Sequence, residues 1–414
     1  MGWAKRKMEE DEARGFTTGN NTLICSRHFQ DYAIVAYIEL NGKNNQCDYC
    51  DEDDSNEPYV ISFDDLMDVI VQGICNHYGN PDDEGIGFDS REGGYMHDEI
   101  YDTYDLIRDE IMLEADEAVI EEIIQTIGMK NWCHYNPYNL SEAEELSFDW
   151  DIFCNLIKHE SRFVFFKHPK RINKDTGESL EPSYILDRIG HFIVDMTLFY
   201  NTRKHDELFE DLHMYRARQH SIDTGVTNAC QLGPPPRLKA IKANRFSPAG
   251  IPMFYGSGRR QTAIDEIVDR SKLDEIITTG MFKNVKPLNL VDLSQIPEVS
   301  IFDLEKSYLY EPSHFLRRFV LSVSQPIIKD GREHFEYVPT QVVTEYIRYV
   351  LPEITKHSID GIKYRSSIDQ QDCFVIFATQ DHCEDKGNER GDTILALETS
   401  SIRTLNIGEY KSHT

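Results

Sequence analysis

No run of eighteen or more apolar residues occurs in this 414-residue sequence, and no apolar stretch follows its charge-rich first ten residues. The missing run excludes a membrane-spanning helix, and the charged start excludes a secretory signal. The nine cysteines are an odd number and are mostly scattered, which favours reduced thiols over a disulfide framework. We therefore expect a cytoplasmic protein with no membrane partner.

Positive charge is also scarce, since 43 Lys and Arg stand against 72 Asp and Glu and give a formal net charge of −29. A protein that binds phosphate backbones needs basic side chains to displace counterions, so this composition argues against nucleic acid as a partner. The basic residues are unevenly spread. Residues 212–260 hold 8 basic and 1 acidic side chains, whereas residues 51–120 hold 2 basic and 22 acidic ones. A local positive stretch in an acidic protein indicates a small anionic ligand.

The length and the pattern of apolar residues predict an α+β protein with three zones. Residues 1–55 contain a Cys and His cluster and end in the acidic run 51–54, which is typical of a solvated linker. Residues 56–205 have apolar residues at helical spacing and predict a helical domain. Residues 206–414 alternate short β-prone runs with short helices, and predict strands near 253–255, 288–293 and 373–378 and a helix that starts at Pro339.

Four residues of the first zone have the spacing of a zinc site. Cys25 and His28 are spaced C-x2-H, Cys47 and Cys50 are spaced C-x2-C, and eighteen residues separate the two pairs. A two-residue gap lets both side chains of a pair face one tetrahedral ion, and four protein ligands leave no open position. The pattern therefore predicts a structural zinc ion that helps to fold the segment. Unrelated buried side chains and a redox C-x2-C remain as alternatives.

The most informative stretch runs from Asn244 to Ile267. Arg245 precedes a turn, Tyr255 ends a short apolar strand, and Glu266 follows a second turn. Thr262 and Asp265 have capping-box spacing, so we expect a helix that starts at Thr262 and holds Glu266 in its opening turns. This order of strand, turn and helix predicts that an Arg, a Tyr and a Glu converge at one edge of a sheet.

These three residue types suit the cleavage of a glycosidic bond in a dinucleotide. A guanidinium can hold a pyrophosphate, and a phenol offers a flat face and a hydroxyl to a nicotinamide ring. A carboxylate can stabilise the positive charge that develops on the sugar as the base departs. Taken one at a time, a surface ion pair for Arg245, a solvated helix face for Glu266 and a core position for Tyr255 are equally ordinary roles.

The same intervals resemble the RES domain, a toxin module in which an Arg, a Tyr ten residues later and a Glu eleven residues after that recur. Arg245, Tyr255 and Glu266 reproduce both intervals. The Ser of the family follows a Gly and an aromatic, and Gly361 to Ser367 fits that place, with Ser366 as the counterpart and Ser367 as the adjacent rival. Arg216, in the stretch Tyr-Arg-Ala-Arg, matches the upstream Arg of the family. The resemblance covers residues 206–400.

The RES resemblance implies a fold similar to ADP-ribosyltransferases and an enzyme that uses NAD as substrate. It implies Arg245, Tyr255, Glu266 and Ser366 as catalytic residues, and Arg216, Arg245 and Tyr255 as NAD-binding residues. It also implies a toxin, held by an antitoxin or inhibitor protein, that destroys NAD by hydrolysis or phosphorolysis. A protein ADP-ribosyltransferase and an inactive binding or sensor module are the alternatives.

Residues 20–205 resemble the zinc-binding, HEPN-like helical region that is fused to RES domains. This part has no convincing HEPN ribonuclease signature, which is an Arg four to six residues before a His. The acceptor of the ADP-ribose group, the activating signal, the role of the helical domain and the oligomeric state, a homo-oligomer included, stay open.

Overall fold

A computed structural model describes residues 3–50, 58–91, 93–97, 99–172, 179–204, 208–325 and 331–410. The chain divides into two compact units. The first contains residues 1–143 and 298–313, and the second contains residues 144–297 and 314–414. The acidic run 51–54 and the boundaries expected at 55/56 and 205/206 lie outside the described residues, so these boundaries stay predictions.

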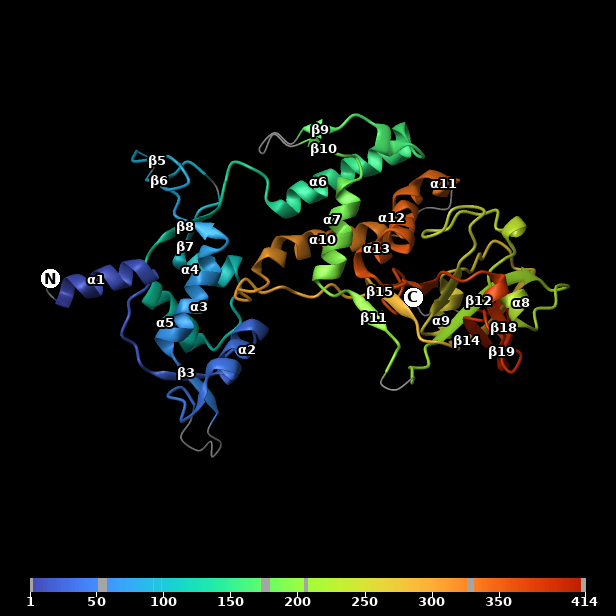
Figure 1. The fold of residues 1–414 in the computed structure, drawn as a ribbon, viewed down its shortest axis with the longest axis horizontal. Coiled ribbons are helices and arrows are strands. Elements are labelled where there is room, and N and C mark those ends of the chain that lie inside the picture. Colours follow the sequence, from blue (N-terminus) through green and yellow to red (C-terminus); the bar gives the residue numbers. More distant parts are fainter. Residues whose placement is uncertain are drawn as a thin grey trace. The chain divides into compact units, whose positions relative to one another are not determined.

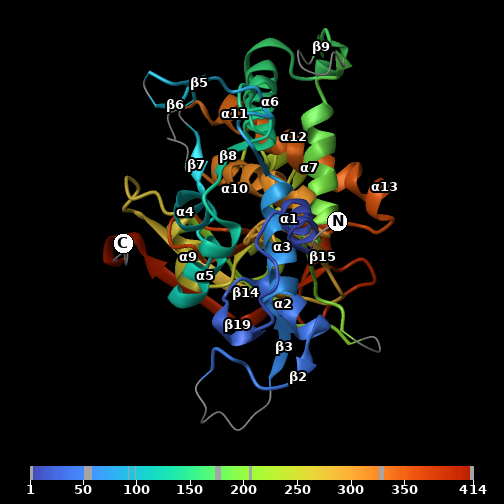
Figure 2. The ribbon, with the colours of Figure 1, turned by 90° about the vertical axis from the view of Figure 1, so that its left-hand side faces the viewer.

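The first unit is mainly helical and carries three small antiparallel sheets, ordered β1-β3-β2, β4-β8-β7 and β5-β6 (Figure 1). Figure 2 shows β2 and β3 side by side. Its helices are α1 (Trp3–Arg14), α2 (Tyr32–Asn41), α3 (Phe63–Cys75), α4 (Thr103–Asp105) and α5 (Glu117–Ile127). Its strands are β1 (Leu23–Cys25), β2 (Lys43–Asn44), β3 (Tyr59–Ser62), β4 (Tyr78–Gly79), β5 (Phe88–Asp89), β6 (Gly94–Tyr95), β7 (Tyr101–Asp102) and β8 (Asn131–His134).

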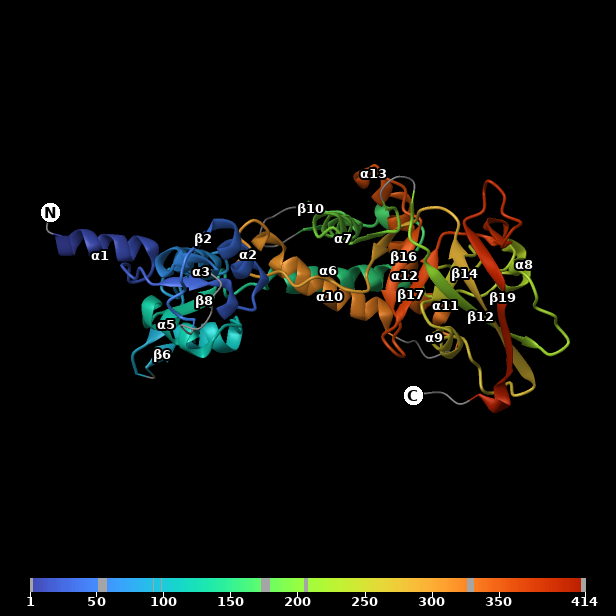
Figure 3. The same cartoon turned by 90° about the horizontal axis from the view of Figure 1, so that it is seen from below.

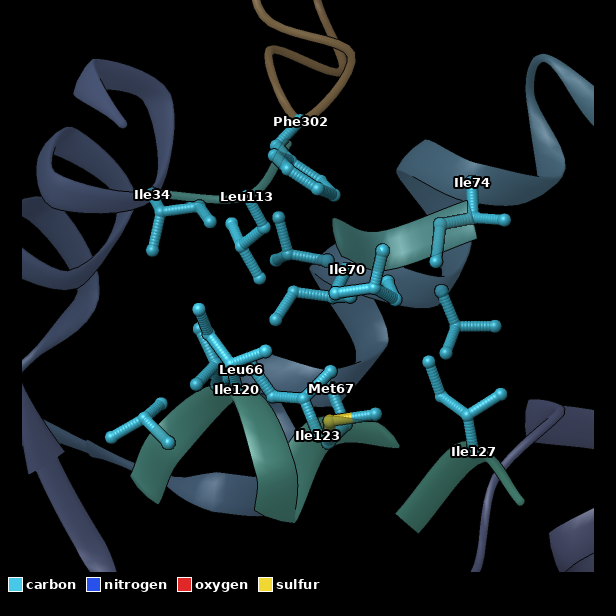
Figure 4. Packing of buried hydrophobic residues seen from close by; sticks show 14 of the residues in the cluster. Ile34, Leu66, Met67, Ile70, Ile74, Leu113, Ile120, Ile123, Ile127 and Phe302 are labelled. Carbon is cyan, nitrogen blue, oxygen red and sulfur yellow. The ribbon is translucent and has the colours of Figure 1, made fainter. Parts of the chain in front are cut away.

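The core of the first unit forms around α3. This helix begins where the Ser62 hydroxyl accepts a hydrogen bond from the Asp65 N–H at 3.1 Å, which satisfies one of the free donors of its first turn. Its apolar side chains recur every three or four residues and therefore share one face, which packs against α5, as Figure 4 shows for Met67 and Ile123.

A distant segment completes this core. Ile301 and Phe302 are both 3% exposed and pack in the same cluster, although they lie more than 170 residues beyond α5 in the sequence (Figure 4). Gly73 makes the approach possible, because a Cβ at that position would lie 2.8 Å from Cδ1 of Phe302. A substitution there would push the segment away.

The second unit is built on a nine-stranded sheet ordered β11-β15-β16-β17-β13-β12-β14-β19-β18. Neighbouring strands are antiparallel except β15 with β16 and β18 with β19. Figure 3 shows the long strands β12, β14 and β19 running beside one another. The sheet strands are β11 (Phe199–Asn201), β12 (His213–Ser221), β13 (Phe254–Ser257), β14 (Glu275–Asn284), β15 (Asn289–Asp292), β16 (Gly361–Arg365), β17 (Asp372–Ile376), β18 (Cys383–Asp385) and β19 (Leu395–Asn406).

The helices of the second unit are α7 (Tyr184–Asp195), α8 (Ala229–Leu232), α9 (Arg260–Asp265), α11 (Glu333–Glu336), α12 (Val338–Tyr349) and α13 (Leu351–Thr355), with most of α6 (Glu142–Asn155) and α10 (Tyr310–Ser324). A separate hairpin pairs β9 (Arg171–Ile172) with β10 (Ser179–Leu180). In the described part of the chain, no helix has both the length and the apolar character needed to cross a membrane.

The predicted fold class, a helical N-terminal region followed by a mixed α and β domain, is confirmed. The three predicted strands appear as β13, β15 and β17, and the predicted helix appears as α12, with Pro339 in its first turn. Pro lacks an N–H that a first helical turn leaves unpaired in any case. The short strands β4 to β10 were not predicted, because most of them pair only two residues.

Candidate functional site

A cavity of about 1010 Å³ opens in the second unit where β12 and β13 separate. The two strands pair at a single position, Tyr215 with Ser257. Gly256 allows that close approach, because a Cβ there would lie 3.0 Å from Cβ of Met214. Beyond this pair the backbone ladder is replaced by a side chain, since Arg216 Nη1 donates to the carbonyl of Tyr255 at 2.9 Å. The sheet thus opens at the level of the predicted site residues.

Arg216, on β12, lines the cavity as a half-buried cation. Its Nε donates to the carbonyl of Leu232 at 2.7 Å, and its guanidinium lies 5.3 Å from the ring centre of Phe254. Burial lowers the pKa of Arg216 to about 10, so the side chain is charged at neutral pH. Both of its hydrogen-bond partners are neutral carbonyls. A half-buried cation without a carboxylate partner in the described part of the chain is suited to an anionic ligand.

Arg245 lines the same cavity from a turn that is fixed on both sides. Within the turn, Asn244 and Ser247 exchange backbone hydrogen bonds at 2.8 and 3.2 Å. From α12, Gln341 Nε2 donates to the carbonyl of Asn244 at 2.8 Å. Among the described residues, the guanidinium itself makes one hydrogen bond, from Nη2 to the carbonyl of Gln325 at 3.2 Å, the limit of a normal distance. The backbone of the turn is therefore fixed, while the Arg245 guanidinium can still form further hydrogen bonds with a ligand.

Tyr255 and Tyr364 add two phenols to the cavity wall. Tyr255 on β13 shares a hydrogen bond with the hydroxyl of Ser247 at 2.8 Å, and Tyr364 on β16 packs against the ring of Phe246 at 4.8 Å. Burial raises the pKa of Tyr255 to about 12 and that of Tyr364 well above its usual value. Both phenols therefore keep their protons and can donate hydrogen bonds.

Glu266 lies at the end of α9, not in its opening turns as the sequence predicted. The helix starts at Arg260, ahead of Thr262, so the predicted capping box is wrong. The Thr262 hydroxyl instead donates to Asp369 Oδ2 at 2.5 Å, and the Glu266 N–H bonds to the carbonyl of Thr262 at 3.0 Å. Glu266 thus directly follows the last turn of α9, as its C-cap, and lines the cavity.

The two candidate serines occupy different environments. Ser366 has 0% exposure, lies in the turn after β16 and donates from its hydroxyl to Glu266 Oε1 at 2.5 Å. Ser367 lines the cavity. The geometry therefore favours Ser366 over Ser367 as the serine that orients Glu266.

If the site consumes NAD, as the sequence predicts, we expect Ser366→Ala to lower kcat for NAD about 10- to 100-fold. The Glu266 carboxylate would lose the one side-chain donor that fixes it among the described residues. Ser367→Ala, the matched control, should change kcat less than threefold. Steady-state kinetics of both variants distinguish the two serines, and a reversed order of effects would refute this assignment.

Sequence reasoning missed the residues that support the site. Ser247 and Gln341 have no expected catalytic role. Ser247 forms a hydrogen bond with the Tyr255 hydroxyl, and Gln341 holds the turn that carries Arg245. A signal for Gln341 was present, since it is a polar residue beside the apolar face of the predicted helix and is 7% exposed in α12. The role of Ser247 depends on a contact across the turn that its position alone does not indicate.

The four predicted metal ligands come together in the first unit. The ligand atoms of Cys25, His28, Cys47 and Cys50 all lie within 4.8 Å of one another. Cys25 Sγ lies 3.6 Å from Cys50 Sγ, and His28 Nε2 lies 3.4 Å from the sulfurs of both Cys47 and Cys50. Zinc bonds of about 2.3 Å to sulfur and about 2.0 Å to nitrogen put tetrahedral edges at roughly 3.5 to 3.8 Å. The cluster therefore fits one tetrahedral ion.

The surroundings of His28 also fit a metal ligand. Its other ring nitrogen, Nδ1, lies 2.7 Å from Asp116 Oδ2 at the start of α5, and the Asp116 N–H bonds to the His28 carbonyl at 2.9 Å. A carboxylate in this position fixes the ring orientation and directs the Nε2 lone pair to a metal. Asp116 is thus a supporting residue that the spacing of the cysteines did not reveal.

Comparison with known proteins identifies two domains. The family HEPN/RES N-terminal domain 1 matches residues 40–171, and the RES domain matches residues 213–396. No curated protein matches the chain. Among solved structures, a chain of the M. tuberculosis MbcT–MbcA toxin–antitoxin complex matches with 10% identity and a TM-score of 0.29, covering 54% of this chain and 94% of that one. These matches confirm the resemblance of the chain to a HEPN-like N-terminal region fused to a RES domain.

Proposed function

We propose that the RES domain consumes NAD in the cavity between β12 and β13, by cleaving the bond between nicotinamide and ribose. The observation that carries the proposal is that Arg216, Arg245, Tyr255 and Glu266 line one cavity. Its volume of about 1010 Å³ lies at the upper end of the range for small-molecule sites, which suits a dinucleotide. The RES family match supports the same substrate.

The basic residues account for the phosphates. Arg216 and Arg245 come from different elements but both line the cavity, and neither has a carboxylate partner in the described residues. Two guanidiniums can hold the pyrophosphate by paired, charge-assisted hydrogen bonds. Tyr255 would then place its ring and hydroxyl at the nicotinamide ribose.

Glu266 would supply the chemistry. The bond between the ribose C1′ and the nicotinamide nitrogen breaks, its electron pair leaves with nicotinamide, and nicotinamide departs as a neutral molecule. The ribose is left with an oxocarbenium-like positive charge that the Glu266 carboxylate stabilises, while Ser366 orients that carboxylate. Water, inorganic phosphate or a protein side chain then forms the new bond to C1′ and loses a proton.

In a cell this activity would make the protein a toxin or defence effector that drains NAD. Such an enzyme needs restraint until it is required, so a protein inhibitor or antitoxin is the expected partner. The RES family match supports this part of the proposal.

We also propose a structural zinc ion at Cys25, His28, Cys47 and Cys50. The observations behind it are the four ligand atoms, which all lie within 4.8 Å of one another, and the Asp116 contact of His28. Four protein ligands leave no coordination position for a substrate, so the ion would stabilise the first unit and would take no part in catalysis.

The test is to incubate the purified full chain with NAD labelled in its adenosine part, with and without inorganic phosphate. If the enzyme hydrolyses NAD, we expect free ADP-ribose in both samples. If it is a phosphorylase, we expect ADP-ribose 1-phosphate, and only in the sample that contains inorganic phosphate. Label on the protein itself would indicate ADP-ribosyl transfer instead. Intact NAD in every sample would contradict the proposal and favour a binding or sensor module.

A further inference from the structure

The helix that carries Glu266 is held in place from outside. α9 has six residues, which is too short for a helix to be stable by itself. Two of its side-chain contacts, from Thr262 to Asp369 and from Glu266 to Ser366, come from the turn after β16. A third set of contacts comes from the C-terminal end of the described chain, where the short turn Ile407–Glu409 follows β19.

Tyr410 is the centre of this third set. Its hydroxyl donates to Asp265 Oδ1 at 2.7 Å, and Gln261 Nε2 donates to Asp265 Oδ2 at 3.0 Å. Gln261 Nε2 also bonds to the Tyr410 hydroxyl oxygen. Burial raises the pKa of Tyr410, so the hydroxyl keeps the proton that it donates. Both oxygens of the Asp265 carboxylate, which lines the cavity beside Glu266, are therefore occupied.

Apolar packing holds the same segment against α9. Ile407 joins a buried cluster with Ile264 of α9 and Ile277 of β14, and Tyr410 packs against this cluster. The Arg270 guanidinium lies 5.9 Å from the centre of the Tyr410 ring. These contacts hold the ring of Tyr410 in place even if the hydroxyl is removed. A substitution that removes only the hydroxyl therefore measures the effect of its hydrogen bonds.

We propose that Tyr410 is a positioning residue of the active site. By holding Asp265 it fixes the last turn of α9, and with it the Glu266 carboxylate that follows. The inference rests on the proposed function, because it assumes that Glu266 acts on NAD. It makes the C-terminal segment, some 145 residues away in the sequence, part of the catalytic architecture.

The experiment is the Tyr410→Phe substitution in the full chain, which removes the hydroxyl and keeps the ring. We expect kcat for NAD consumption to fall about tenfold, because small displacements of a catalytic group are costly, while KM changes less than about twofold. Tyr346→Phe is the matched control. The Tyr346 hydroxyl donates to Asp187 Oδ1 at 3.0 Å in the same unit, so this variant loses a comparable bond and should keep its kcat.

A double-mutant cycle with Asp265→Ala, which removes both oxygens that accept hydrogen bonds from Tyr410 and Gln261, tests the route of the effect. If Tyr410 acts through Asp265, adding Tyr410→Phe to Asp265→Ala should lower kcat by less than about twofold. A further tenfold loss would overturn the inference, and so would an unchanged kcat in Tyr410→Phe alone. In both cases the parent chain would still consume NAD, whereas an inactive parent chain would instead overturn the proposed function and this inference with it.

Discussion

Glu266→Gln is expected to lower kcat for NAD consumption roughly 100- to 1000-fold, the usual effect of removing an electrostatic stabiliser from a transition state. A neutral amide cannot balance the positive charge on the departing ribose. The Gln carbonyl oxygen can still accept the hydrogen bond that Ser366 donates at 2.5 Å, so the fold should be retained. The measurements are kcat and KM for NAD, with the thermal unfolding midpoint recorded in parallel.

Glu353→Gln is the control for this change. Glu353 is an exposed residue of α13 and does not line the cavity, so its loss of charge should leave kcat within about twofold. KM for Glu266→Gln should stay within a few-fold of the parent value, because its role lies in the transition state. A Glu266→Gln enzyme that keeps more than a tenth of its kcat would remove Glu266 from the mechanism.

Cys47→Ser should release the metal and destabilise the first unit. Structural zinc sites bind with apparent free energies of about 10–16 kcal/mol, which is of the same order as the total stability of about 5–15 kcal/mol of a typical domain. We therefore expect native mass spectrometry to show one zinc ion per parent chain and none in the variant. The unfolding midpoint of the first unit should drop by roughly 10 °C or more.

Cys75→Ser provides the comparison, since Cys75 is exposed in α3 and does not belong to the four-residue cluster. This variant should keep one zinc ion and its unfolding midpoint. A parent chain without bound metal after purification in zinc-containing buffer would contradict the zinc proposal. A Cys47→Ser variant that keeps its zinc would contradict the assigned ligand.

The features that sequence predicted well are those that depend on short-range spacing. Cys25 and His28 are three residues apart and lie within one short turn, so their meeting is almost a local event. The strand β17 is a continuous buried run, which is why its composition is so distinctive. Tyr255 and Glu266 reach one cavity for a similar reason, because only a strand end and one short helix separate them.

The features that sequence did not predict depend on contacts between distant segments. The Thr262 hydroxyl donates a hydrogen bond to Asp369 and does not cap the helix. A local sequence motif cannot predict this contact, because Asp369 is more than 100 residues away in the sequence. Arg216 donates to the backbone carbonyls of Leu232 and Tyr255. Because every residue has a carbonyl, the types of these side chains do not predict the contacts. The same holds for Tyr410 and Asp265, because the strands β14 to β19 and several helices lie between them in the sequence.

The excursion of residues 298–313 into the first unit has a practical consequence for anyone who wishes to study the RES domain in isolation. These residues leave the second unit after β15 and return to it within α10, so the second unit is discontinuous in the sequence, inside the stretch 213–396 that matches the RES domain. A fragment that starts near residue 206 would contain Ile301 and Phe302 without the cluster that buries them. Their exposed apolar surface would promote aggregation. Excising the RES domain cleanly requires a short polar bridge in place of the excursion as well as a new N-terminus.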